Sequence, residues 1–246
     1  MLGLQWHHAN GNTVGVDHPE RGMANTKSRT AVRPRVIVSD ADIKDGVRAL
    51  RRKCEVLRRV HDLTGHPPLR RRPAGFEGLA RIIVGQQLSV ASASAIWERT
   101  ALACQPFEPA VLLALTDKQL AAVGLSRPKI RTLRAISEAC AGGLDLTRLE
   151  HLAHEEVHAT LTAVSGIGPW TADVYIMFCL GRADGWAPGD LALQVAAQQA
   201  FELDERPDND RMLELAERWR PWRGVAARLL WAYYAALKAK RTAVPV

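Results

Sequence analysis

The chain contains few cysteines, and no two of them lie close together. They are Cys54, Cys104, Cys140 and Cys179 in 246 residues, so no pair has the short spacing of a zinc or redox motif. Four separate free thiols are typical of a reducing compartment. We therefore expect an intracellular protein, cytoplasmic if the source is a prokaryote and nuclear otherwise.

Long hydrophobic runs are also missing. No stretch of eighteen or more apolar residues occurs, which argues against a membrane-spanning helix. Residues 1–8 lack the charged start and the apolar stretch of a signal peptide. Residues 1–38 show no sustained hydrophobic period, so we expect a basic leader that is disordered or loosely ordered.

What remains is the composition of a globular protein with a basic surface. Hydrophobic residues make up 47% of the chain and charged residues 24%, enough for one sizeable domain or two lobes that share a core. The net charge of +7 favours an anionic partner, with nucleic acid first and an anionic membrane second. Charge alone does not decide between a binding surface and a merely solvated one.

From residue 39 onward the apolar residues recur at spacings of three and four, which predicts helices. One amphipathic helix is expected from residue 39 to about residue 60, with a buried face made of Ile43, Val47, Leu50, Cys54, Leu57 and Val60. Prolines and glycines predict a loop over residues 64–74. No stretch alternates with a period of two, so the expected fold class is all-α.

Two adjacent amides mark the junction between the next two predicted helices. These helices begin near residues 75 and 90, and Gln86 and Gln87 lie between them in the sequence GQQLS. Buried amides need hydrogen-bond partners. The pair either caps neighbouring backbone groups or lines a groove.

The most informative segment is residues 161–172, LTAVSGIGPWTA. Gly166 and Gly168 permit a sharp reversal between two helices while Ile167 packs between them. Such a turn leaves N–H groups exposed at the start of the second helix, where the helix dipole also favours an anion. Glycines between helices also serve as ordinary C-caps, so these residues alone only suggest phosphate binding.

In this segment the chain resembles the helix-hairpin-helix DNA glycosylase superfamily. The match is position by position and comprises Leu161, Val164, Ser165, Gly166, Ile167, Gly168, Thr171 and Ala172. The superfamily has an aspartate one helix and one loop later, and Asp190 in WAPGDLA occupies that place. The resemblance covers about residues 40–240 and implies a partner, double-stranded DNA.

Two features indicate the branch of the superfamily. Members that also cleave the strand carry a catalytic lysine where this chain has Trp170, and a tryptophan cannot form a Schiff base. No group of four close cysteines follows, as the iron-sulfur branch would require. With ERWRPWR at residues 217–223, the chain is most similar to the 3-methyladenine DNA glycosylase II family. The first forty residues cannot supply the N-terminal α/β domain of that family's type member, so we expect its compact form.

The resemblance also implies roles for individual residues. Asp190 is the expected catalytic carboxylate, although an aspartate at this position could simply cap the following helix. Trp170 and Trp231 are expected to line the pocket for the damaged base. Where the type member has a pocket tyrosine this chain has Val174, so we expect the neighbouring Tyr175 to take that part.

The remaining implied contacts are with DNA and with a cation. Gly166, Ile167, Gly168 and Thr171 are expected at the DNA backbone, with Gln87 or alternatively Leu88 filling the space that the flipped base leaves. No cofactor is expected. A structural monovalent cation bound by backbone carbonyls of Val164 and Gly166 remains open.

Three hypotheses follow. The first is a monofunctional, monomeric glycosylase that flips 3-methyladenine, 7-methylguanine and related purines out of DNA and hydrolyses the glycosidic bond. The second is a glycosylase for oxidised or deaminated bases, and the third is a non-catalytic DNA-binding protein. We expect two helical lobes, residues 39–74 with 186–246 and residues 75–185, with the active-site cleft between them.

Overall fold

The computed structural model describes residues 34–242, which form twelve α-helices and one 3-10 helix. The fold class is all-α, as the sequence predicts. The only strand-like pairing in this part of the chain is a single antiparallel bridge between Val36 and Arg182. No helix in it is long and apolar enough to cross a membrane.

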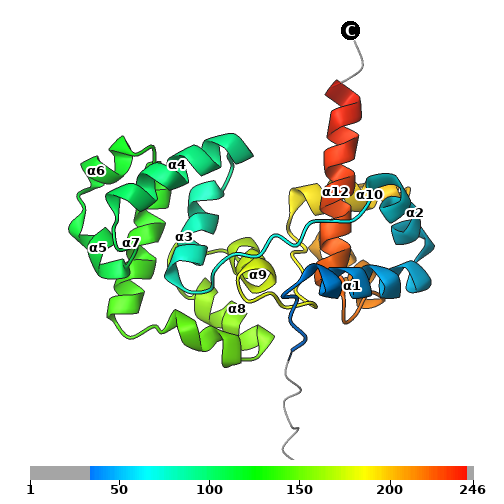
Figure 1. Ribbon diagram of the computed structural model, residues 1–246, viewed down its shortest axis with the longest axis horizontal. Helices are drawn as coiled ribbons and strands as arrows, with labels where there is room; N and C mark the ends of the chain where they lie inside the picture. Colours follow the sequence, from blue (N-terminus) through cyan, green and yellow to red (C-terminus); the bar gives the residue numbers. More distant parts are fainter. Residues whose placement is uncertain (1–33, 243–246) are drawn as a thin grey trace, which may run out of the picture. The chain divides into compact units, whose positions relative to one another are not determined.

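The helices fall into two groups by their contacts. Helix α3 packs against α4, α7 and α9, α7 packs against α5 and α6, and α8 packs against α9. Helix α12 packs against α1, α2 and α10. Figure 1 shows α9 between these groups. The bounds are α1 Asp40–Lys53, α2 Glu55–Thr64, α3 Phe76–Gly85, α4 Val90–Ala103, α5 Pro109–Ala114, α6 Asp117–Ala122, α7 Arg127–Ala141, η1 Leu146–His151, α8 His154–Thr162, α9 Pro169–Phe178, α10 Leu191–Ala200, α11 Asn209–Glu217 and α12 Arg223–Thr242.

The helix expected from residue 39 to about residue 60 is in fact two helices. Cys54 is extended, with φ −144° and ψ 111°, and it ends α1 and begins α2. Both helices contact α12, and the predicted apolar residues are buried on either side of the break. The apolar spacing continues through Cys54, so the spacing alone did not reveal this correction.

The last five residues of the expected leader, residues 34–38, belong to the described part of the structure. The backbone there pairs with the segment that follows α9: Ile37 N–H donates to Gly181 O at 2.7 Å, and Ala183 N–H donates to Arg35 O at 2.8 Å. The Ile37 side chain is fully buried. Residues 1–33 lie outside the described part of the chain.

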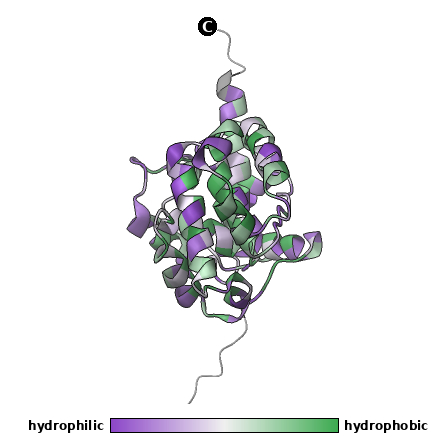
Figure 2. Cartoon of the chain, turned by 90° about the vertical axis from the view of Figure 1, so that its left-hand side faces the viewer, coloured by the Kyte–Doolittle hydropathy of each residue, from purple (hydrophilic) through white to green (hydrophobic). Residues whose placement is uncertain are grey.

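The core is one continuous cluster of buried hydrophobic side chains. Figure 2 shows hydrophobic and hydrophilic residues mixed along single helices, as expected of helices that each bury one face in a common core. Helix α9 is the exception, because every residue from Thr171 to Phe178 is buried. A helix buried on all sides is held firmly by its neighbours, and α9 carries part of the candidate site.

Candidate active site

The turn between α8 and α9 has the geometry that the two glycines predict. Gly166 has a φ of +84°, and a Cβ added there would lie 2.2 Å from Thr132 Oγ1, so only glycine fits. Ile167 is buried, and its N–H donates to Val164 O at 3.0 Å. Gly168 is exposed at the start of α9, where an α-helix leaves its first N–H groups without intrahelical acceptors.

Thr171 lies inside the protein, which corrects its expected place at the DNA backbone. Its side chain is only 3% exposed. Its hydroxyl accepts a hydrogen bond from Gln86 Nε2 at 2.9 Å. Thr171 therefore joins the hairpin to the turn between α3 and α4. The sequence placed Gln86 at this junction but did not identify its partner.

The α3–α4 turn also carries the two candidates for the residue that fills the gap left by the flipped base, and both are exposed to solvent. Gln87 is exposed and has a left-handed φ of 57°, and Leu88 is 37% exposed. A groove of about 510 Å³ runs between this turn, the start of α7 and the hairpin; it is lined by Gln86, Gln87, Ser126, Pro128, Lys129, Arg131, Thr132, Ser165 and Gly166. Gln87, one of the two proposed plug residues, thus shares one groove with Ser165 and Gly166 of the hairpin.

Asp190 caps α10, because its Oδ1 accepts the Leu193 N–H at 2.9 Å. The carboxylate also accepts two indole hydrogens, one from Trp170 Nε1 to Oδ2 at 2.7 Å and one from Trp231 Nε1 to Oδ1 at 3.0 Å. Asp190 is 8% exposed. The alternative cap role is therefore present, and both tryptophans expected in the base pocket donate to the same carboxylate.

The two tryptophans come from different helices and are both half-buried. Trp170 lies in the first turn of α9, and Trp231 lies within α12. One side of Trp231 meets Phe178, with 5.5 Å between ring centroids. The Arg228 guanidinium lies 4.7 Å from the centre of the Phe178 ring. A stack of side chains thus supports Trp231 from the core.

Arg228 is a buried cation that binds backbone carbonyls. It donates to Gly224 O at 2.7 Å, to Met177 O at 3.2 Å and to Leu69 O at 3.3 Å. Burial, aided by the charges of Arg71 and Arg70, lowers its pKa to about 10. It therefore stays charged at neutral pH and connects α12, the end of α9 and the segment before α3.

Tyr175, which was expected to line the base pocket, lies in the core of the protein. Its side chain is fully buried, and its hydroxyl oxygen accepts the Gly75 N–H at 2.8 Å. Burial raises the pKa of this phenol well above its usual range. Trp170 and Tyr175 are five residues apart on α9, so their side chains leave the helix in different directions. Val174 is buried too.

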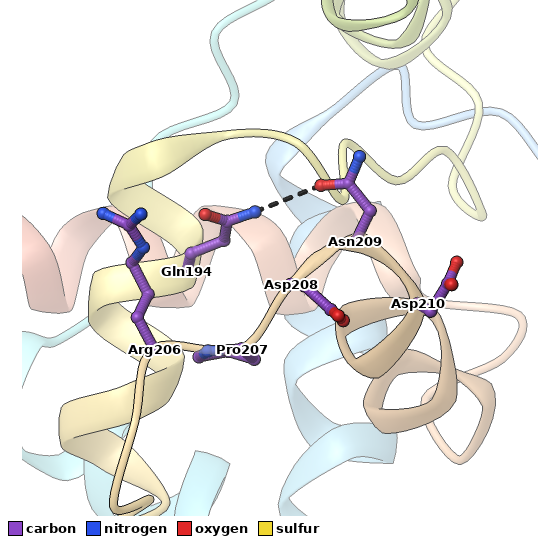
Figure 3. Close-up of a pocket in the computed structure, with 6 residues that line it drawn as sticks. All are labelled: Gln194, Arg206, Pro207, Asp208, Asn209 and Asp210. Carbon is purple, nitrogen blue, oxygen red and sulfur yellow. Dashed lines mark hydrogen bonds between the residues drawn. The ribbon is translucent and has the colours of Figure 1, made fainter.

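The turn that carries Asp190 is supported from α10 and α11. Gln194 Nε2 donates to Pro188 O at 3.0 Å and to Asn209 Oδ1 at 3.2 Å, as Figure 3 shows for the side-chain pair. A neighbouring pocket of about 540 Å³ is lined by Gln194, Arg206, Pro207, Asp208, Asn209 and Asp210. Asp190 is not in this lining. The sequence could have indicated Gln194 as a supporting residue, because it lies one helical turn after Asp190.

Asp173 is a buried acid that the sequence analysis did not single out. It is 6% exposed on α9, and His158 Nε2 of α8 lies 3.8 Å from its Oδ1. Burial raises the pKa of Asp173 to about 7, against the opposing charge of Arg223. The sequence could have indicated this residue, because it is an aspartate within an otherwise apolar helix.

Among the described residues, the candidate ligands for a metal ion are backbone oxygens. They contain no group of three or more His, Cys, Asp or Glu side chains that could hold one. The Val164 carbonyl accepts the Ile167 N–H and retains a second lone pair, which is the kind of donor a hard cation uses. A monovalent cation held by the carbonyls of Val164 and Gly166 stays a proposal.

The fold and this site define a class: an all-α protein with a glycine hairpin and, one helix and a loop later, a carboxylate in contact with two indoles. A family model described as HhH-GPD superfamily base excision DNA repair protein matches residues 80–221. The chain belongs to this family, which confirms the resemblance seen in its hairpin.

Individual relatives agree with the family. The YfjP protein of Bacillus subtilis is 33% identical over 169 residues, which cover 63% of this chain and 58% of YfjP. The aligned part thus spans less than two thirds of that relative. The DNA-3-methyladenine glycosidase of Bacillus halodurans superposes with a TM-score of 0.67 at 31% identity, covering 85% of this chain and 95% of that one. The 3-methyladenine DNA glycosylase Mag1 of fission yeast, solved with abasic DNA, superposes with a TM-score of 0.68 at 28% identity. The superposition covers 77% of this chain and 95% of Mag1.

Proposed function

We propose that this protein is a monofunctional DNA glycosylase that removes alkylated purines such as 3-methyladenine and 7-methylguanine from double-stranded DNA. The observation that carries the proposal is the Asp190 carboxylate, which lies in contact with two tryptophans one helix and a loop after the hairpin. Family membership and the names of two similar solved structures support the substrate class.

The chemistry begins with DNA binding. The exposed turn around Gly166 and Gly168 would contact the backbone, and the target nucleotide would rotate out of the stack. Gln87, or Leu88 in its place, would occupy the gap from the exposed α3–α4 turn. An alkylated purine is cationic or electron-poor, so it stacks well on the indole faces beside Asp190.

Bond cleavage then depends on charge. As the glycosidic bond breaks, its electron pair leaves with the base and positive charge develops on the sugar. A carboxylate beside the sugar stabilises that charge, orients the water whose oxygen bonds to C1′ and accepts the proton that this water loses. Trp170 stands where a strand-cleaving relative would need a nucleophilic amine, so we expect an intact abasic strand as the product.

The test is base release from methylated DNA. The wild-type protein should release 3-methyladenine and 7-methylguanine, identified by chromatography, and leave the strand uncut. The variant Asp190→Asn should lose at least about 100-fold in single-turnover rate, as expected when a preorganised charge is removed, and should bind the same duplex about as tightly. Base release that survives this substitution would refute the role of Asp190.

A panel of lesions separates the remaining hypotheses. Release of oxidised or deaminated bases in place of alkylpurines would change the substrate class but keep the carboxylate chemistry. Salt-dependent binding with no product from any lesion would instead indicate a DNA-binding protein without activity.

A further inference from the structure

The Asp190 carboxylate is surrounded unevenly by hydrogen-bond donors. Its Oδ1 accepts two N–H groups, one from the Leu193 backbone at 2.9 Å and one from the Trp231 indole at 3.0 Å. Its Oδ2 accepts one, from the Trp170 indole at 2.7 Å. A carboxylate has about four lone-pair sites. With three of them in use, the remaining site belongs to Oδ2.

We propose that Trp170 and Trp231 are positioning residues that set the orientation of the Asp190 carboxylate and leave Oδ2 as the oxygen that faces the reacting sugar and its water. This inference rests on the proposed function of Asp190. It assigns the two indoles a role through their N–H groups, in addition to the stacking expected of their faces. An indole N–H lies in the ring plane, so this hydrogen bond leaves a ring face free.

The cap alone would not define this orientation. A helix N-cap needs only one carboxylate oxygen, here Oδ1, and the carboxylate could still turn about its bond to Cβ. The indoles remove that freedom because they approach the two oxygens separately. Their sequence separations from Asp190 are 20 and 41 residues, so each ties the carboxylate to a different helix.

The supports behind the indoles make them suitable for this task. Trp231 rests on Phe178, which Arg228 covers with its guanidinium. Trp170 lies in the first turn of α9, a helix in which every residue from Thr171 to Phe178 is buried. A donor on a firm support holds its acceptor more narrowly than one on a mobile side chain. The orientation of Oδ2 therefore depends on α9 and α12 being correctly placed.

The first test removes the N–H and keeps an aromatic ring. Trp170→Phe and Trp231→Phe should each lower the single-turnover rate of 3-methyladenine release by about 10- to 100-fold, the range expected for losing a hydrogen bond to a charged group. The dissociation constant for the lesion duplex should change less than about threefold. Loss of rate together with binding would indicate a stacking or folding role and contradict the proposal.

Trp219 provides a matched control. Its indole is fully buried, and its Nε1 has no hydrogen-bond partner among the residues whose side chains are described. Trp219→Phe therefore removes a buried indole without breaking an indole hydrogen bond, and its rate should match that of the wild type. Equal losses of rate in all three variants would overturn the positioning role.

The second test needs no activity, and it compares two proteins that both keep Trp170 and Trp231. The chain has seven tryptophans, whose indole N–H signals can be assigned in a ¹H–¹⁵N correlation spectrum from single Trp→Phe variants. Asp190→Asn should shift the Trp170 and Trp231 signals strongly and leave the Trp219 signal in place. Unmoved signals would overturn the proposal. Shifted signals in a protein that releases no base would overturn only the proposed function.

Discussion

Gln86 donates its amide hydrogen to the Thr171 hydroxyl at 2.9 Å and so joins the α3–α4 turn to the hairpin helix. One end of this contact carries the proposed plug residues, and the other lies one residue after Trp170. The two parts of the protein expected to touch DNA are therefore connected inside the protein. This contact explains why one of the two adjacent amides is half-buried while Gln87 is exposed.

A double-mutant cycle tests the Gln86–Thr171 contact. Thr171→Val keeps the side chain's shape and removes the acceptor, and Gln86→Ala removes the donor. Each should lower the free energy of unfolding by about 1 kcal/mol, with a coupling energy of about the same size, because a part-buried hydrogen bond is lost. Urea unfolding measures both quantities. Strictly additive effects would show that the two side chains do not interact in solution.

The hairpin glycines should respond differently to alanine. At Gly166 the φ is +84° and the new Cβ would meet Thr132 Oγ1 at 2.2 Å, so Gly166→Ala should cost about 1–3 kcal/mol of stability. At Gly168 an added Cβ meets nothing within 4 Å, so stability should stay the same.

DNA affinity separates the hairpin's two roles. If the exposed face of the turn contacts the DNA backbone, Gly168→Ala should weaken duplex binding several-fold despite its normal stability, because the methyl group occupies the contact surface. Thermal unfolding and fluorescence anisotropy with a labelled duplex measure the two effects. Unchanged affinity in Gly168→Ala would remove this turn from the proposed interface.

Asp173 should make stability depend on pH. Its pKa is raised from the ordinary value of 3.8 to about 7 in the folded protein. Between these values the folded state holds more protons than the unfolded state. The contribution of Asp173 to the free energy of unfolding is therefore fully present below about pH 4, and it is lost as the pH rises through 7. The free energy of unfolding should fall by up to about 4 kcal/mol from this group across that window.

Asp173→Asn is the control for that prediction. Another group titrates in the same window: His154, whose pKa is lowered from its ordinary value of 6.5 by burial. The difference between the wild-type and Asp173→Asn stability curves isolates the aspartate. That difference should grow in favour of the variant as the pH rises from 5 to 8. A difference that is constant with pH would contradict the assignment.

Parts of the fold that depend on local patterns could be predicted from the sequence. The two helices around residues 85–89 and the turn at Gly166 follow from apolar spacing and from glycine, and the structure has both. The break at Cys54 could not be predicted, because the apolar period passes through it unchanged. The burial of Tyr175 was missed for a similar reason. A helix that is apolar on every side gives no sign of which face meets a pocket.

The sequence by itself determined the helical class, the hairpin and the order of hairpin and aspartate, because these depend on residues close together along the chain. Only the tertiary structure decided that Trp170 and Trp231 donate to different oxygens of Asp190. That contact depends on how α9, α10 and α12 are oriented. Their orientation is set by the packing of the buried side chains between them, and a linear pattern of residue types does not contain it.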